Sequence, residues 1–238
     1  YNNNNNNNNY NNNNNNNNIN NDNNNITERV VKYKKGKKEK KNSTHTNNTK
    51  DNTKEENINH NSNIHNGDNK KKSIFIMGDS MVKKVRGFEL TKSIRHKANI
   101  KVRSFPKAKV RCMTDHIKPT IREESPDHIV IHTGTNEIPS EKTPIQICND
   151  IINLAQSIKD QNIDVSISAI VPRYDDFHDK VNDFNNYLYN ICENIGFNFI
   201  RHDNIRPELH LNQSKLHLNW KVNSILLSNF KKYLNNLD

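Results

Sequence analysis

The chain has 238 residues, of which 36 are Lys or Arg and 26 are Asp or Glu, and only 31% belong to the hydrophobic set. This length is typical of one domain, and the low hydrophobic share indicates that a polar segment is attached to it. No stretch approaches the ~18 consecutive apolar residues of a membrane-spanning helix, so we expect no membrane contact.

Residues 1–72 form a polar tail with 13 Lys or Arg, 7 Asp or Glu and only nine residues of the hydrophobic set. Residues 1–25 contain 21 Asn and too few apolar side chains to form a core, so we predict that the tail is disordered. Residues 32–41 contain seven Lys, which favours either a solvated linker or a weak contact with nucleic acid. The folded domain is predicted to span residues 73–238.

From Ser73 onward, short apolar runs rich in β-branched residues alternate with segments of helical periodicity. Runs of this length and composition are typical of buried strands. The five predicted strands are residues 74–77, 100–105, 129–132, 165–171 and 197–200.

The segments between and after these strands place apolar residues on one helical face. One helix is predicted to begin near Ala108, and Pro119 should kink or end it. Further helices are predicted around residues 148–158, 181–195 and 222–237. The alternation predicts an α/β fold, a three-layer α/β/α sandwich with a five-stranded parallel sheet in the flavodoxin-like order 2-1-3-4-5.

In such a sheet, ligands bind beyond the carboxyl ends of the strands, where the strand order reverses. Ser80 follows the first strand and begins a predicted helix, so its hydroxyl is a candidate nucleophile. Asn136 follows the third strand and offers a neutral N–H donor that suits an oxyanion. Composition and periodicity alone favour the simpler interpretation, in which Ser80 is a helix N-cap and Asn136 a turn residue. The eleven His leave the general base unassigned.

Three short motifs resemble blocks of the SGNH/GDSL hydrolase family. They are Gly-Asp-Ser at 78–80, Gly-Thr-Asn-Glu at 134–137 and Leu-His-Leu-Asn at 216–219, in the family's order and spacing. The resemblance covers residues 73 to about 235. More narrowly, residues 78–83, 171–173 and 214–219 resemble the esterase-like domains associated with animal retrotransposon-type elements.

The resemblance implies a serine esterase that acts on a small acyl ester, such as an acetyl ester, through an acyl-enzyme. Ser80 would be the nucleophile and His217 the general base, by the usual triad logic. The Asn136 side chain and the backbone amides near Ser80 would form the oxyanion hole. The resemblance implies no cofactor and no metal, and the loops that carry these groups include Gly78, Asp79, Lys107, Gly134 and Thr135.

The sequence departs from the family pattern at three positions. The family usually has an Asp three residues before the His, and this position is Ser214, so the imidazole of His217 lacks its expected carboxylate. Lys107 stands near the family's glycine oxyanion donor, and Val222 stands where Gly is common. An alternative function follows, a catalytically impaired domain of mobile-element origin that acts as a binding module or is a remnant. The candidates that could orient the imidazole instead are Asp203, Glu208 or a backbone carbonyl.

Cys112, Cys148 and Cys192 are odd in number and set in apolar stretches, which favours reduced buried thiols and an intracellular compartment. His128 and His132 share one strand face without acidic or Cys partners at ligand spacing, so we expect structural histidines. We also expect a monomer, and a true N-terminus that lies upstream of the first residue, which is not Met.

Overall fold

Five parallel strands form the centre of the protein, whose computed structural model describes residues 71–210, 219 and 223–237. All described residues belong to one compact unit, Asp68–Asp238. The sheet order β2-β1-β3-β4-β5 confirms the predicted order. The strands are β1 (Lys72–Gly78), β2 (Ala98–Ser104), β3 (His128–His132), β4 (Asp164–Ser168) and β5 (Asn198–Ile200).

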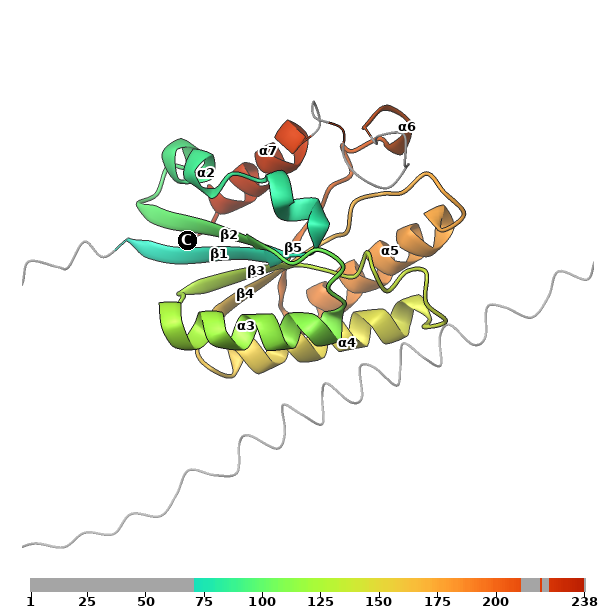
Figure 1. Ribbon diagram of the computed structural model, residues 1–238, viewed down its shortest axis with the longest axis horizontal. Helices are drawn as coiled ribbons and strands as arrows, with labels where there is room; N and C mark the ends of the chain where they lie inside the picture. The colour runs from blue at the N-terminus through green and yellow to red at the C-terminus, as the bar shows by residue number, and fades with distance from the viewer. Residues whose placement is uncertain (1–70, 211–218, 220–222, 238) are drawn as a thin grey trace, which may run out of the picture. The chain divides into compact units, whose positions relative to one another are not determined.

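The helices cover both faces of the sheet and confirm the predicted α/β sandwich. Figure 1 shows α2 and α7 on one face, and α3, α4 and α5 on the other. Among the described residues, no helix is long and apolar enough to cross a membrane. The helical elements are η1 (Ser80–Lys84, a 3-10 helix), α2 (Gly87–Ser93), α3 (Val110–Glu124), α4 (Pro144–Lys159), α5 (His178–Ile195), α6 (Pro207–His210) and α7 (Asn223–Leu234).

Alternate residues of β1 point to opposite faces of the sheet, and both faces are buried. Ile74 and Ile76 pack into one apolar cluster with Leu226 and Phe230 of α7. Complete burial of a side chain such as Phe230 contributes about 1.5–3 kcal/mol. The C-terminal helix is therefore part of the core that supports β1.

The predicted fourth strand is longer than the observed one, because β4 ends at Ser168 and not at residue 171. The side chain of Asn185 explains the early end. It accepts a hydrogen bond from the backbone N–H of Ile170 and donates one to the Ile170 carbonyl, both at 3.0 Å. A helix side chain thus replaces the neighbouring strand as the partner of this backbone.

Pro119 neither ends nor visibly breaks α3, contrary to prediction, since the helix continues to Glu124. A proline inside a helix removes the hydrogen bond to the carbonyl four residues earlier, which belongs to Asp115. Both residues lie on the exposed side of the helix, where water can hydrate that carbonyl. The structure describes only Lys71 and Lys72 of the predicted disordered tail, and β1 begins at Lys72, one residue before the predicted domain boundary.

The three cysteines are free, but they are not all buried. Cys148 and Cys192 lie in the core, as predicted, and burial raises the pKa of Cys192 to about 12. Cys112 is exposed on α3, and the prediction was wrong for this residue. The residue lies on the solvent face of an amphipathic helix whose buried positions include Val110 and Met113.

Candidate active site

The carboxyl ends of β1 and of its two neighbours, β2 and β3, lie level with one another. Gly78 at the end of β1 is in register with Ser104 of β2 and with His132 of β3. The loops that carry Ser80 and Asn136 therefore leave the sheet at the same edge, from β1 and from β3. The order reverses beside β1, so these loops flank the position at which α/β sheets bind ligands.

Backbone hydrogen bonds to the segments on both sides, β3 and the loop after β2, hold the turn after β1. The backbone N–H of Asp79 donates to the carbonyl of His132 at 3.2 Å, and the carbonyl of Gly78 accepts from Phe105 N–H at 2.8 Å. A Cβ atom on Gly78 would lie 2.4 Å from the His132 carbonyl oxygen, which is closer than real Cβ atoms approach. Only glycine therefore allows β1 to pass this close to β3 and still turn toward Ser80.

Asp79 is fully buried and caps the element that follows it. Its Oδ1 accepts from the backbone N–H of Met81 at 2.9 Å. Ser80 is the first residue of η1 and is half-buried. The helix that was predicted to begin at Ser80 is thus a five-residue 3-10 helix. A Cβ on Gly87 would lie 2.5 Å from the Ile100 carbonyl, so the chain must approach β2 closely before α2 begins.

The side chain of Asn136 connects two of the loops at this edge. Its Nδ2 donates to the backbone oxygen of Ala108 at 2.9 Å, and the residue is half-buried. An amide nitrogen carries two N–H donors, so this bond orients the group and leaves the second N–H for a ligand. Asn136 is therefore more than a turn residue, because it also fixes the loop after β2.

Lys107 occupies the strained position that the sequence suggested. Its φ is 65°, in the left-handed region, and its side chain is exposed. A lysine resists a positive φ, but the chain adopts this conformation in the turn closed by Ala108 N–H and the Phe105 carbonyl at 3.0 Å. For a non-glycine residue this conformation costs about 1–2 kcal/mol.

Gly134 and Thr135 lie buried at the start of the β3 loop. Gly134 has a φ of 125°, and a Cβ there would lie 3.0 Å from the ring of Phe184. The position therefore favours glycine on two grounds, conformation and space. The hydroxyl of Thr135 has no hydrogen-bond partner among the described residues.

Glu137 has a role that sequence reasoning missed. Its carboxylate accepts a hydrogen bond from the backbone N–H of Val110, the first residue of α3, while the N-cap residue Lys109 supplies no side-chain bond. Burial raises the pKa of Glu137. The signal in the sequence was an acidic residue beside Asn136 and before the buried Ile138. Glu137 holds the β3 loop against the start of α3.

A buried chain of hydrogen bonds runs behind the turn at Asp79. Asn229 Nδ2 donates to His202 Nδ1 at 3.0 Å. Because this nitrogen accepts, the Nε2 of His202 carries the proton and donates to Ser168 Oγ at 2.8 Å. Ser168 Oγ also lies within hydrogen-bond distance of His132 Nδ1, at 2.9 Å, and of the Ala169 carbonyl oxygen, at 3.2 Å.

The chain ends beside the carboxylate of Asp79. Burial lowers the pKa of His132, and the negative charge of Asp79 opposes this shift. The atoms Asp79 Oδ2 and His132 Nε2 are buried and have no hydrogen-bond partner among the described residues. Burial likewise lowers the pKa of His202 to about 3, so both imidazoles are neutral at pH 7. His132 is thus a structural histidine, as predicted, but it also lies directly behind the candidate nucleophile turn.

His128 is a second buried histidine, bonded through Nε2 to Ser166 Oγ at 2.7 Å. The described part of the chain contains no group of three or more His, Cys, Asp or Glu arranged to hold a metal ion. The two candidate carboxylates for His217 are exposed. Asp203 bonds to Arg201 Nε at 2.7 Å, and Glu208 lies on α6.

Ser214, His217 and Val222 lie outside the described residues. The approach of Ser80 to His217 therefore stays a prediction, as does the absence of a carboxylate behind the imidazole. The described structure brings together the loops of Ser80, Lys107 and Asn136 at one edge of the sheet.

These features define an α/β sandwich with a serine turn after β1 and an asparagine loop after β3. No family model matches the chain, and no curated protein matches it. Solved structures of other proteins do match the fold of this chain. A member of the lipolytic G-D-S-L family from Veillonella parvula has a TM-score of 0.60 and 16% identity, over 70% of this chain and all of that one.

Two further structures are esterases. The psychrotrophic esterase EstA from Pseudoalteromonas sp. has a TM-score of 0.56 and 16% identity, over 70% of this chain and 100% of that one. A catalytic mutant of the acetylxylan esterase Axe2 from Geobacillus stearothermophilus has a TM-score of 0.58 and 13% identity, over 70% of this chain and 95% of that one. The chain therefore has the fold of the GDSL lipases and acylhydrolases.

Proposed function

We propose that this protein is a serine ester hydrolase of the SGNH type that acts on a small acyl ester, such as an acetyl ester. The observation that supports the proposal most directly is the pairing of two loops. The turn of Asp79 and Ser80 and the loop of Asn136 flank the switch point of a sheet whose solved neighbours include esterases.

The proposed reaction has two halves. Ser80 Oγ attacks the ester carbonyl carbon while His217 takes the hydroxyl proton, and the tetrahedral intermediate collapses as His217 returns that proton to the leaving alkoxide. Water then attacks the acyl-Ser80 ester with the same base, which releases the acid and restores the hydroxyl. In both halves a negative charge develops on the former carbonyl oxygen.

Asn136 is the proposed side-chain donor to that oxygen. Its bond to the Ala108 carbonyl fixes the amide plane before substrate arrives, so little reorganisation is needed when the charge develops. One donor of this kind contributes about 2.7–4 kcal/mol to transition-state stabilisation. The backbone amides near Ser80 are the proposed second donors.

Ser80 is tested by covalent labelling. A fluorophosphonate probe should modify Ser80 in the full-length protein, and Ser80→Ala should abolish both the labelling and the hydrolysis of short-chain aryl esters. Ser157→Ala is the matched control, because Ser157 is an exposed serine of α4 that bonds only to the Leu154 carbonyl. The proposal fails if folded wild-type protein is not labelled and hydrolyses aryl esters no faster than Ser80→Ala.

Ser214→Asp tests whether the missing carboxylate limits the rate. In the serine protease that the triad logic derives from, replacing the triad Asp by Asn lowers kcat by about 10⁴. If Ser80 and His217 are the catalytic pair, the new carboxylate should raise kcat, while Ser214→Asn should leave it unchanged. Labelling of Ser80 without turnover in any of these variants would favour the alternative, a binding module descended from an esterase.

A further inference from the structure

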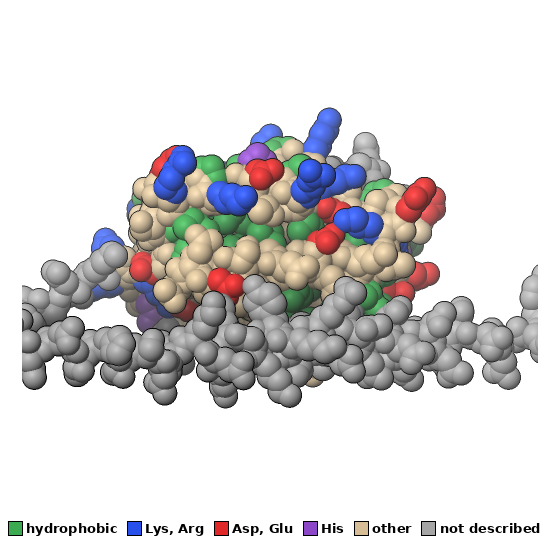
Figure 2. All heavy atoms as spheres, turned by 90° about the horizontal axis from the view of Figure 1, so that it is seen from below, with side chains coloured by type: hydrophobic (Ala, Val, Ile, Leu, Met, Phe, Trp, Pro, Cys, Tyr) green, Lys and Arg blue, Asp and Glu red, His purple; other side chains and the backbone are tan. Residues whose placement is uncertain are grey.

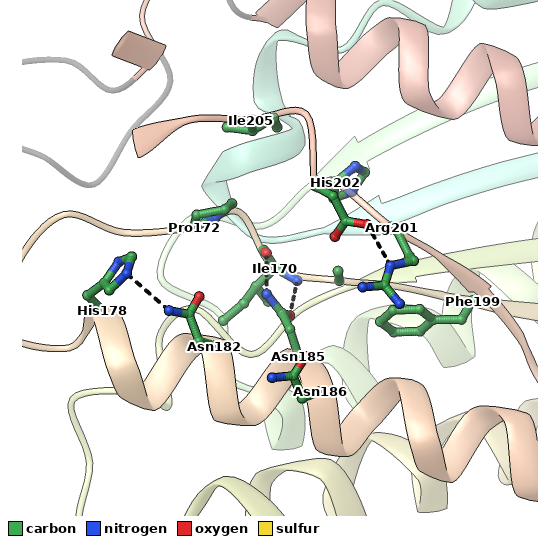
Figure 3. Close-up of a pocket in the computed structure, with 12 residues that line it drawn as sticks. Ile170, Pro172, His178, Asn182, Asn185, Asn186, Phe199, Arg201, His202 and Ile205 are labelled. Atoms are coloured by element: carbon green, nitrogen blue, oxygen red, sulfur yellow. Dashed lines mark hydrogen bonds and ion pairs between the residues drawn. The ribbon is translucent and has the colours of Figure 1, made fainter. Parts of the chain in front are cut away.

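A cavity of about 530 Å³ lies at the carboxyl ends of β4 and β5, and its lining includes neither Ser80 nor Asn136. Its size falls within the ~300–1,000 Å³ range of small-molecule sites. Figure 3 shows that α5 forms one wall and that the chain around and after β5 forms the other. In the sheet, β3 and β4 separate β5 from β1, so β5 lies about 14 Å from the strand that carries Ser80.

The α5 wall consists of amide groups held in fixed orientations. His178 Nδ1 donates to the Arg173 carbonyl at 2.6 Å, so its Nε2 accepts from Asn182 Nδ2 at 3.0 Å. This arrangement leaves the amide oxygen of Asn182 free to accept. Asn186 also lines the cavity and has no hydrogen-bond partner among the described residues. One wall therefore offers both donors and acceptors.

The opposite wall carries one ion pair, formed by Arg201 and Asp203. Arg201 Nε donates to Asp203 Oδ2 at 2.7 Å, and its guanidinium lies over the ring of Tyr189 at 4.7 Å. The pair has no net charge, but it keeps free N–H groups and a free carboxylate oxygen. Phe199 and Ile170 add apolar surface between the two walls.

Three ligand classes fit this lining poorly. An anion would meet the carboxylate of Asp203, and a cation would meet the guanidinium of Arg201. A purely apolar ligand would leave the amides of Asn182 and Asn186 without hydrogen bonds, which is costly for groups removed from water. A neutral ligand with many hydroxyl groups satisfies donors and acceptors on both walls and places its C–H face against Phe199.

We propose that this cavity is a binding site for a neutral, hydroxyl-rich ligand of about disaccharide size, held by Asn182, Asn186 and the Arg201–Asp203 pair. This site goes beyond the proposed ester hydrolysis, since its lining contains neither Ser80 nor Asn136. Binding there requires no turnover, so the two proposals can fail separately.

The test is saturation-transfer NMR on the full-length protein with cellobiose, xylobiose and maltose as probes. At least one disaccharide should bind with a Kd on the order of 1 mM. Asn186→Leu should weaken that binding at least ~10-fold, because it removes a donor and an acceptor from the wall. Asn190→Leu is the matched control, since Asn190 is exposed one turn further along α5 and does not line the cavity. It should bind as the wild type does.

Thermal unfolding and a second variant, Asn186→Gln, distinguish a loss of ligand binding from a loss of folding. Asn186 makes no hydrogen bond to the described residues, so both leucine variants should melt within about 2 °C of the wild type, as surface changes do. Asn186→Gln retains both amide functions and should recover part of the affinity. The proposal is overturned if no disaccharide binds the wild type, if Asn186→Leu binds as well as Asn190→Leu, or if hexanoate or methyl phosphate competes as strongly as the sugar.

Discussion

The side-chain amide of Asn136 lies 2.9 Å from the backbone oxygen of Ala108, so a single residue of the β3 loop positions the loop after β2. This bond gives Asn136 two separable roles. One is to hold the turn that contains Lys107, and the other is to present its second N–H to a ligand at the edge of the sheet.

Asn136→Ala should lower kcat for an aryl ester by about 10²–10³, the loss found when one oxyanion donor is removed. The melting temperature should fall only slightly, because the lost hydrogen bond is worth about 1 kcal/mol. Steady-state kinetics and thermal unfolding measure the two effects. Asn153→Ala, on the exposed side of α4, should change neither. Equal activity in the two variants would contradict the oxyanion role.

Gly78→Ala should disturb the nucleophile turn directly. The new methyl group would lie 2.4 Å from the His132 carbonyl, so β1 and β3 must move apart, at a cost of about 1–3 kcal/mol. Gly196→Ala is an informative comparison. Its φ of 75° makes alanine unfavourable, yet no atom lies within 4 Å of the new Cβ.

Both glycine variants should therefore lose stability in urea, but only Gly78→Ala should lose fluorophosphonate labelling of Ser80 as well. Labelling rates in the folded protein, measured below the unfolding transition, separate the two. A Gly78→Ala protein that is labelled at the wild-type rate would show that the tight turn does not position Ser80.

The buried histidines should make the protein less stable in mild acid. Burial lowers the pKa of His202 from 6.5 to about 3 and that of His128 from 6.5 to about 4. Below pH 6.5 the unfolded chain therefore binds protons that the folded chain does not bind. The stabilisation is complete above pH 6.5 and is lost as the pH falls toward the folded pKa values, by up to ~1.4 kcal/mol per histidine and pH unit.

Urea unfolding between pH 7.5 and pH 5 measures how the free energy of unfolding depends on pH. This free energy should fall more steeply with decreasing pH in the wild type than in His202→Gln. The variant itself should be less stable at pH 7.5, because it breaks the hydrogen bonds to Ser168 and Asn229. His96→Gln replaces an exposed histidine and should keep the wild-type slope. Equal slopes in all three proteins would exclude His202 as a source of the acid sensitivity.

The three thiols should differ in reactivity. Cys112 is exposed, whereas burial raises the pKa of Cys148 and Cys192, so these two form little thiolate near pH 8. A disulfide exchange reagent should titrate one thiol per folded chain and three in guanidinium chloride. Cys112→Ser should reduce the native count to zero, and rapid reaction of a second thiol would contradict the burial of the other two.

The order of the sheet was predictable because each strand is a short apolar run and each intervening segment has a helical period. The errors came from tertiary contacts that leave no local pattern. Asn185 ends β4 early by binding the backbone of Ile170, and the exposed position of Pro119 lets α3 continue. The exposure of Cys112 likewise depends on which helix face meets the sheet.

The residues of the candidate site were predicted from their positions after the strands, and not from the hydrophobic periodicity of the sequence. Ser80 and Asn136 were identifiable because they follow the strands at the switch point. The residues that hold these two loops in place were not identifiable from the sequence. Glu137 binds the N-terminus of α3, and His202 joins His132 through Ser168, contacts that span tens of residues in the sequence. Lys107 shows the reverse case, in which a residue that disfavours the left-handed region adopts it because the loop requires that conformation.

The direction of β1 has a practical consequence for handling this protein. Lys72 begins the strand and Gly78 ends it, so the N-terminal extension joins the sheet about 20 Å from the edge that carries Ser80. An affinity label or a surface tether attached directly at Lys71 therefore lies at the amino-terminal end of β1. Immobilisation through that end is the orientation to choose for biosensor or flow-reactor work.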